Sequence, residues 1–338
     1  MNAYSKRLLS VSGLGVLISI KNLIVGKDRK VHAKIVARSI LYPLIAVVLF
    51  LLLWSFVAAR IQTSLGGIPG PRQVYKAAGI LWQEHRDERQ RERDFIRGQK
   101  KQNEEIRTAN PDAVIQIRKY SGKPTYIDQI FTSLKTVFTG FLIASLIAIP
   151  LGLLCGLNKG VMSALNPLIQ VFKPISPLAW LPIVTIVISS IYVSNDGFFE
   201  KSFIISAITV SLCSIWPSLI NTSVGVNNID KDHLNLAKVF QLSPTKKLFK
   251  IVLPSALPLI FAGLRISLGI GWMVLIATEM LAQNPGLGKF IWDEFQNGSS
   301  NSLSKIFVAV ITIGIIGFFL DRIMLLLERM VTYNKNQS

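Results

Sequence analysis

Histidine, cysteine and acidic residues are scarce in this chain of 338 residues. Its three histidines, His32, His85 and His233, are far apart in sequence, and none stands in an HExxH or similar metal-binding pattern. The two cysteines, Cys155 and Cys213, lie inside apolar stretches and form no CxxC pair. The sequence therefore supports neither a metal centre nor a disulfide framework.

Motifs of common enzyme classes are also missing. The chain has no GxSxG nucleophile elbow and no GxxxxGK(S/T) phosphate loop, because Gly288-Lys289 is followed by Phe290. We therefore expect a protein that is not an enzyme and that holds no cofactor of its own. If ATP drives its activity, a separate ATPase chain must bind the ATP and the magnesium.

Basic residues outnumber acidic ones, with 37 Lys and Arg against 19 Asp and Glu and a formal net charge of +18. They flank long apolar runs, which is typical of the excess of Lys and Arg on the cytoplasmic side of membrane proteins and of contact with lipid headgroups. A basic composition can also indicate nucleic-acid binding. The placement of the charges argues against that interpretation.

Long apolar runs dominate the sequence, which is 50% hydrophobic with a mean hydropathy of +0.45. A membrane core of about 30 Å needs about 20 apolar residues in a helix. We therefore predict an all-α, multi-pass membrane protein. Six spans are predicted, over residues 39–59, 136–157, 162–193, 203–222, 263–282 and 306–327.

The third predicted span carries four prolines, Pro167, Pro174, Pro177 and Pro182, so it is either one broken span or a tight hairpin. Basic segments help to decide. Both the N-terminal tail and residues 224–258 are rich in Lys, which places them in the cytoplasm. They share a side only if the third segment crosses once, so we predict six spans with both termini inside.

This topology divides the chain into parts of different composition. They are a cytoplasmic basic tail (1–38), a first span (39–59), a charged extracytoplasmic insert (60–133), a membrane core (134–330) with a cytoplasmic loop (224–258), and a cytoplasmic tail (331–338). The insert carries many Lys and Arg although it lies outside. The orientation rule weakens for loops of more than about 60 residues, so this conflict is tolerable.

The insert is predicted to contain a solvated helix. A turn-rich exit over residues 66–71 precedes the stretch 83–107, which mixes both charge signs, and Asp87 and Arg91 have the spacing of a helix-supporting ion pair. Two interpretations stay open for this helix: a passive spacer, or a surface that contacts a partner.

Residues 235–254, NLAKVFQLSPTKKLFKIVLP, resemble the EAA loop of ABC importer permeases. Ala237 matches the second Ala of that pattern, and Ile251, Leu253 and Pro254 fall at the expected spacing. Asn235 stands for the Glu. Gln241 stands for the Gly, which puts the local turn in doubt because Gln tolerates positive φ poorly. Ser243-Pro244 follows and can begin a new helix, as cap and first-turn residue.

Further segments resemble the nitrate, sulfonate, taurine and bicarbonate permeases of this class. Residues 173–182, KPISPLAWLP, are similar to their RPxPPLAWxP segment, ATEM at 277–280 to their AAEM, and PGLG at 285–288 to their external turn. The segment 291–298, IWDEFQNG, looks most like the nitrate branch. The resemblance covers about residues 125–330, and it excludes the N-terminal tail and the charged insert.

The resemblance implies a type I ABC importer permease fold in the bacterial inner membrane. It also implies the partners: two ATPase subunits, an extracytoplasmic solute-binding protein and a second permease chain, a homodimer being the simplest pair. The loop at 235–254 would contact the ATPase. Its apolar anchors would be Val239, Phe240, Leu248 and Phe249, with Lys238 among the lysines of a polar rim. A plain interfacial helix is the alternative interpretation.

The proline-rich segment is the predicted translocation pathway. Prolines remove backbone donors, and non-helical backbone at membrane depth survives only inside protein or beside water. Ser176, Pro177 and Trp180 are the candidate lining residues, and a packed structural kink is the alternative. Arg265 is a second candidate, either as an anion contact or as a snorkelling side chain. Glu279 is a third, for which we favour a structural partner such as Lys or a backbone donor.

The substrate implied is a small anion, with nitrate first and bicarbonate, cyanate, taurine and alkanesulfonates open. Two rival classes are weighed. A secondary carrier working without ATP predicts internal repeats, and no convincing repeat is visible. A membrane scaffold without transport is the other, and neighbouring genes for an ATPase and a binding protein would dismiss it.

Overall fold

The structure is a computed structural model that describes residues 37–63, 66–110, 115, 118–192, 199–230, 232, 233, 235 and 239–333. Most of the predicted N-terminal tail lies outside these residues. The chain divides into two compact units, Met1–Tyr75 and Lys76–Ser338. The boundary lies inside the predicted charged insert, in the first turns of one long helix, α5 (Pro71–Ala109).

The first unit contains the first predicted span. A five-residue π-helical turn (η1, Ala37–Leu41) leads into α4 (Tyr42–Ala58), and Pro43 fits there because the first helical turn needs no backbone donor. α4 is apolar on all sides and buries only Ala58, as expected of a helix that faces lipid. Two strands of two residues each follow, β1 (Gln62–Thr63) and β2 (Gly66–Gly67), and they pair antiparallel.

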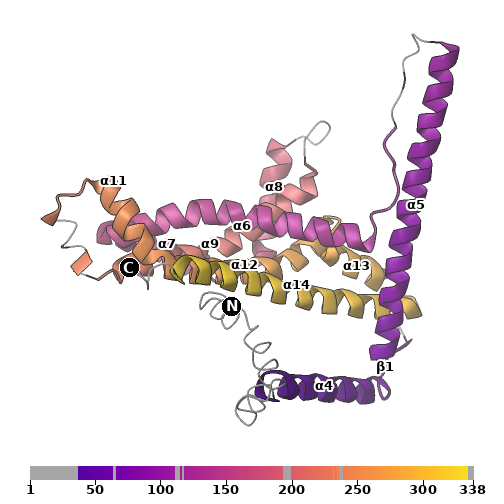
Figure 1. Ribbon diagram of the computed structural model, residues 1–338, viewed down its shortest axis with the longest axis horizontal. Helices are drawn as coiled ribbons and strands as arrows, with labels where there is room; N and C mark the ends of the chain where they lie inside the picture. Colours follow the sequence, from indigo (N-terminus) through magenta and orange to yellow (C-terminus); the bar gives the residue numbers. More distant parts are fainter. Residues whose placement is uncertain are drawn as a thin grey trace, which may run out of the picture. The chain divides into compact units, whose positions relative to one another are not determined.

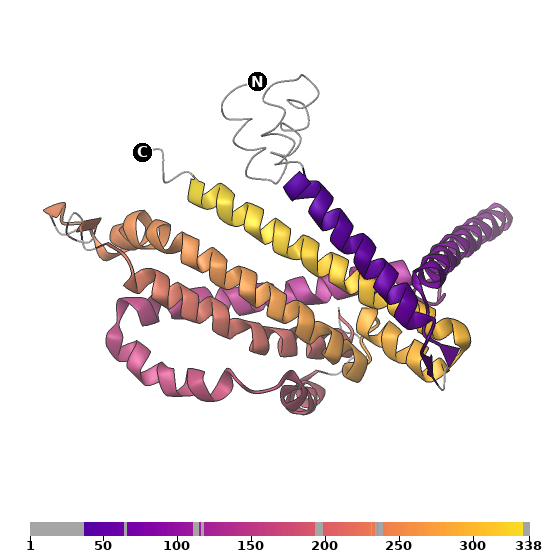
Figure 2. The same cartoon turned by 90° about the horizontal axis from the view of Figure 1, so that it is seen from below.

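The second unit is built from helices. After α5 come α6 (Tyr126–Leu157), α7 (Lys159–Phe172), α8 (Pro177–Ile191), α9 (Lys201–Asn227), α11 (Pro244–Lys247), the π-helical turn η2 (Leu248–Val252), α12 (Leu253–Ala282), α13 (Leu287–Asn297) and α14 (Ser300–Tyr333). Figures 1 and 2 show α6, α9, α12 and α14 running side by side, with α11 at one end of this bundle and α13 at the other.

Helix α9 packs closely against both α6 and α12. Small residues allow this approach: a Cβ at Gly152 of α6 would lie 2.7 Å from the carbonyl oxygen of Leu219, and one at Gly263 of α12 would lie 3.0 Å from that of Pro217. Helices associate in a membrane chiefly by such backbone proximity, because lipid offers no hydrophobic drive between them. The bundle core therefore lies along α9.

Pro217 interrupts the hydrogen-bond ladder of α9, and α12 repairs the gap. The Ser218 amide donates to Ser267 Oγ at 3.1 Å, and the Ser267 hydroxyl donates to the Ser214 carbonyl at 2.6 Å. A freed backbone group in a membrane helix must find a partner in a neighbouring element. Ser267, which has no exposed surface, provides one and fixes the register of the two helices.

The predicted spans correspond to helices in the described residues. Helices α6, α9, α12 and α14 are each long and apolar enough to cross a membrane. The proline-rich segment forms a bent pair, α7 and α8, with 101° between them, which counts as one further span, and α4 is a shorter apolar helix. The predicted all-α fold class is confirmed.

One helix lies outside the predicted spans, and one local expectation was wrong. The segment between the last two predicted spans contains an amphipathic helix, α13, whose Leu287 and Phe290 are buried. Within α5, Arg91 contacts Glu88 at 3.3 Å rather than the predicted Asp87. The helix itself is confirmed, and it is longer than predicted because apolar residues before the charged stretch extend it to Pro71.

Candidate coupling and translocation sites

The predicted coupling segment lies at the α11 end of the bundle (Figure 1). Ser243 caps α11 by accepting a hydrogen bond from the Lys246 amide at 3.5 Å, and Pro244 occupies the first turn, which confirms the expected helix start. Ala237 and Lys238 lie outside the described residues, and Asn235 is exposed. Ile251, Leu253 and Pro254 are half-buried as the chain enters α12.

Gln241 adopts the left-handed conformation, with φ of 47°. It stands where the EAA pattern has Gly, so the turn keeps its geometry although the residue has changed. A Cβ makes this conformation less favourable for Gln than for Gly, by about 1 kcal/mol. The turn therefore forms with Gln241 in place of Gly.

Three large apolar side chains of the segment are exposed. Val239 is 75% exposed, Phe240 71% and Phe249 65%. Leu248, also predicted as an anchor, instead packs against the buried cluster of Val226, Val252 and Ala256, because the π-helical turn directs it inward. Three apolar groups thus remain for a partner, with Lys246 and Lys250 exposed beside them.

The bent pair α7–α8 places two of the candidate pathway residues at its elbow. Ser176 caps α8, accepting a hydrogen bond from the Leu178 amide at 3.3 Å, and Pro177 is the first helical residue. The elbow therefore presents the N-terminal end of a helix of 15 residues, where backbone donors and the helix dipole favour negative charge.

Trp180 lies one turn into α8 within an aromatic stack. Its ring stacks on Phe172 with 5.8 Å between centroids, and Phe172 stacks on Trp216 of α9 at 6.3 Å. The Trp180 indole nitrogen is buried and has no hydrogen-bond acceptor among the described residues. An indole N–H is a donor only, so this group is available to an acceptor.

Arg265 forms an ion pair that the sequence did not reveal. Its Nε and Nη2 donate to the two carboxylate oxygens of Asp321 on α14, at 2.6 and 3.1 Å. This fork-to-fork arrangement fixes α12 against α14. Asp321 neutralises the guanidinium, so a role of Arg265 in a pathway stays a prediction.

Glu279 is completely buried near the end of α12. Its carboxylate accepts from the Ser133 hydroxyl of α6 at 2.9 Å and from the Gly288 amide of α13 at 2.9 Å. The Leu287 amide donates to Ser133 Oγ at 2.8 Å. A Cβ at Gly286 would collide with the carboxylate, so a larger residue there would displace Glu279 from this position. Glu279 thus joins three elements, through a backbone donor of the kind expected.

A comparison with known protein families matches most of this helical bundle. Residues 148–333 match the family described as binding-protein-dependent transport system inner membrane component. The chain belongs to this family. It is therefore a permease, a transport subunit of an ABC importer rather than an enzyme, and a multi-pass protein of the inner membrane.

Named relatives cover much of the same region. The permease is 40% identical over 203 residues to the nitrate import permease protein NrtB of Synechocystis sp., covering 60% of this chain and 69% of that protein. It is 40% identical over 207 residues to the bicarbonate transport system permease protein CmpB of Synechococcus elongatus, covering 61% and 69%.

A solved structure supports the fold. The permease aligns with a chain of the inward-facing MetNI methionine ABC transporter with a TM-score of 0.52, over 61% of this chain and 96% of that chain. At 15% identity this likeness concerns the fold alone. The predicted type I permease fold is confirmed.

Several polar residues of the site were missed from the sequence. Ser133 and Asp321, which pair with Glu279 and Arg265, lie 146 and 56 residues away from them in the chain. Helix α9 also carries buried hydroxyls on its packed faces: Ser206, Thr209, Ser211, Ser214, Ser218, Thr222 and Ser223. In the sequence, the repeated Ser and Thr at helical spacing within an apolar run could have indicated that these positions are buried.

Proposed function

We propose that the permease forms the membrane pathway of an ATP-driven importer for a small inorganic anion, with nitrate as the first candidate. The observation that carries this is the match to nitrate import permeases at 38–40% identity over about 60% of the chain. Bicarbonate is the second candidate, because relatives named for bicarbonate match equally well, at 40% identity.

The elbow between α7 and α8 supports an anion pathway. It combines the N-terminal end of α8, the Ser176 hydroxyl and the indole N–H of Trp180, which meets no acceptor within the described part of the chain. A small monoanion needs only a few such donors, so a pore without a deep cage is sufficient. Selectivity between anions would then reside mainly in the external solute-binding protein.

The energy would come from separate ATPase subunits, which bind the ATP and magnesium. The exposed Val239, Phe240 and Phe249 suit a groove on such a partner. Two permease chains, as a homodimer, would enclose the pathway. Lipid would cover α4 and the outward faces of α14, whose large apolar side chains are exposed in the single chain.

The test is uptake by vesicles that hold the whole reconstituted complex, with ATP inside and labelled nitrate or bicarbonate outside with the binding protein. We expect ATP-dependent accumulation of one of these anions. A Trp180→Phe variant, which keeps the aromatic stack and removes the N–H, should accumulate it more slowly. Accumulation of taurine or an alkanesulfonate instead would assign the permease to sulfonate transport. Accumulation driven by a proton gradient without ATP would show that it is not part of an ATP-driven importer.

A further inference from the structure

Helix α5 lies in a part of the chain that the family match does not explain. The match begins at residue 148, whereas α5 spans Pro71–Ala109. At 1.5 Å per residue a helix of 39 residues is about 58 Å long, far more than a connection between two spans requires. We therefore ask which side chains this helix exposes and which kind of partner they could bind.

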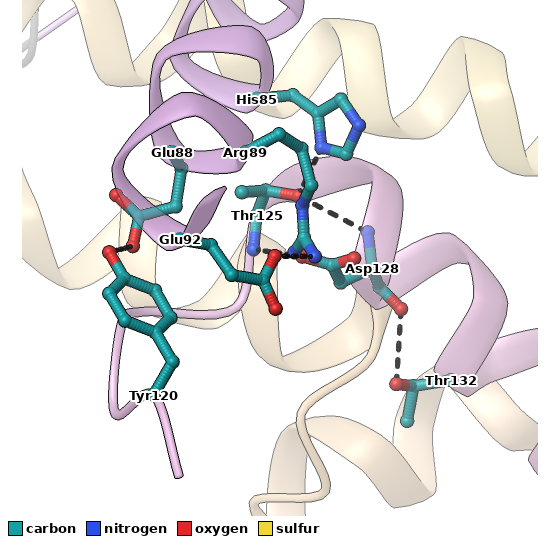
Figure 3. A network of polar contacts seen from close by, with 8 residues as sticks. All are labelled: His85, Glu88, Arg89, Glu92, Tyr120, Thr125, Asp128 and Thr132. Atoms are coloured by element: carbon teal, nitrogen blue, oxygen red, sulfur yellow. Dashed lines mark hydrogen bonds and ion pairs between the residues drawn. The ribbon is translucent and has the colours of Figure 1, made fainter. Parts of the chain in front are cut away.

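One face of α5 is held by the bundle. His85 Nδ1 lies 2.7 Å from Thr125 Oγ1, and Arg89 donates to Asp128 Oδ2 at 2.5 Å (Figure 3). Thr125 and Asp128 are also the capping box that begins α6. Lys305 of α14 pairs with Glu84 at 3.0 Å. The N-terminal half of α5 is therefore anchored to the starts of α6 and α14, at the end of the bundle opposite the predicted coupling segment.

The anchored face uses the acidic side chains of α5. Glu84, Glu88 and Glu92 recur every four residues and so share a face. Glu84 pairs with Lys305, Glu88 accepts the Tyr120 hydroxyl at 2.8 Å, and Glu92 pairs with Arg89 at 2.6 Å. The bond to Glu88 also raises the pKa of Tyr120, which keeps the phenol as the donor. These carboxylates are thus occupied within the chain.

The opposite face is basic. Two residues along a helix correspond to a rotation of about 200°, so Arg86 points away from Glu84 and Glu88. Trp82, Arg86, Arg93, Arg97 and Lys100 follow one another at spacings of four, seven, four and three residues, which keeps them on that face; we call them the basic stripe. All five are exposed, Trp82 by 56%.

The charge of the basic stripe is largely uncompensated. Among the described residues, Arg86, Arg93 and Lys100 make no ion pair, and Arg97 reaches Asp94 only at 3.7 Å with both side chains exposed. Such a pair is worth little in water. Asp87 and Asp94 lie on the flank of the stripe, and the face keeps a net positive charge.

The composition fits a protein partner better than a lipid surface. Trp and Arg are the residues most often found at the energetic centre of protein interfaces. A helix that lies in the membrane surface needs a wide apolar face to enter the lipid. Here the large apolar groups are few: Trp82 lies in the stripe, Tyr75 extends that face and Ile96 lies beside it, and Phe95 points elsewhere, at 5.5 Å from the Tyr120 ring. Charged residues outnumber them on this face.

We propose that the basic stripe of α5 is a docking surface for an acidic face of the extracytoplasmic solute-binding protein of this transporter. This inference rests on the proposed function, which supplies that partner. The anchor to α6 and α14 holds the stripe in one place, which lowers the ordering cost of binding. The charges speed encounter, and Trp82 supplies an apolar contact.

The test measures the affinity of the purified binding protein for the whole transporter complex in discs of zwitterionic lipid. The stripe variant is Arg93→Glu/Arg97→Glu/Lys100→Glu. Its matched control is Arg118→Glu/Lys119→Glu/Lys123→Glu, which makes the same charge change at three exposed residues of the segment that returns to α6. All six positions are exposed, so both variants should fold.

We expect the dissociation constant of the stripe variant to rise by about tenfold and that of the control to stay near wild type. Added salt should weaken wild-type binding and affect the stripe variant little. Binding by the stripe variant within twofold of wild type overturns the inference. So does an effect seen only when the discs contain anionic lipid, which would assign the stripe to headgroups, or one seen only in self-association of the permease.

The two proposals fail in different ways. If the wild-type complex transports and binds its binding protein, but the stripe variant does so equally well, only the docking inference is wrong. If the wild-type complex binds no binding protein and accumulates no anion, the proposed function is wrong and the docking inference falls with it. Retention of the ATPase should be the same in wild type, stripe variant and control.

Discussion

At the scale of single residues, this chain depends on a few polar side chains placed where water cannot reach. Glu279 accepts hydrogen bonds from two other elements, and Ser267 repairs the ladder that Pro217 breaks. A buried polar group without a partner costs far more than a satisfied one contributes. These residues therefore specify which surfaces meet.

Replacement of Glu279 by Ala should destabilise the permease. The change leaves the Ser133 hydroxyl and the Gly288 amide without their acceptor and opens a cavity at a fully buried site. We expect a loss of about 3 kcal/mol, seen as a lower unfolding temperature in detergent.

The Glu279→Gln variant is the matched control, because its amide oxygen can still accept both hydrogen bonds in the same volume. It should lose much less stability than the Ala variant. Equal unfolding temperatures for wild type, Gln and Ala would show that the α6–α12–α13 junction does not depend on this side chain.

At the scale of elements, the short segment from Val239 to Val252 differs from the rest of the unit. The long helices bury their small and polar residues against one another, whereas this segment leaves two aromatic side chains exposed, Phe240 before α11 and Phe249 in η2. Exposed aromatic groups beside lysines are typical of a surface that a partner covers. The left-handed Gln241 sets the turn that presents them.

The Phe240→Asp/Phe249→Asp double variant should release the ATPase from the purified complex. Both rings are mostly exposed in the single chain, so the change removes apolar contacts with the partner and adds two buried charges to the interface without disturbing the core. The measurement is the amount of ATPase that co-purifies with the tagged permease.

The control carries the same change at two exposed aromatic residues at the other end of the unit, Trp82→Asp/Phe295→Asp. It should keep its ATPase. Full co-purification and full substrate-stimulated ATP hydrolysis in the Phe240/Phe249 variant would argue decisively against docking at this segment.

At the scale of the whole molecule, the two ends of the helical bundle differ in chemistry, and this difference predicts how the permease is oriented across the membrane. The predicted coupling segment lies at one end of the bundle, and the anchor of α5, with α13, lies at the other (Figure 1). If the coupling segment is cytoplasmic, α5 must be extracytoplasmic. The topology of the chain can thus be tested at two positions.

A cysteine introduced at Gln90 should react with an impermeant maleimide in intact spheroplasts. Gln90 is exposed on α5, so the reagent can reach it if α5 is outside the membrane. The measurement is labelling before and after the membrane is opened.

A cysteine at Lys246, exposed on α11, is the matched control and should be labelled only after opening. The unmodified chain reports the background from Cys155, which is buried, and Cys213, which is half-buried. Labelling of Gln90→Cys that requires an open membrane would reverse the predicted topology.

The sequence by itself determined the membrane class and the helical fold, and it predicted a coupling segment, because all three are read from local properties. Apolar runs of about 20 residues are read directly from composition, and the EAA-like motif lies within 20 consecutive residues. Even the cap of α11 was predictable, since Ser243 and Pro244 act within one turn.

Only the tertiary structure decided the polar partnerships. Ser133 and Glu279 are separated by 146 residues, and Arg89 and Asp128 by 39, so no local pattern announces either contact. The structure likewise reveals α13 between the last two predicted spans, where burial of Leu287 and Phe290 stabilises a short helix. Within a membrane protein, apolar length selects the helices, and scattered polar groups that must be satisfied select how those helices meet.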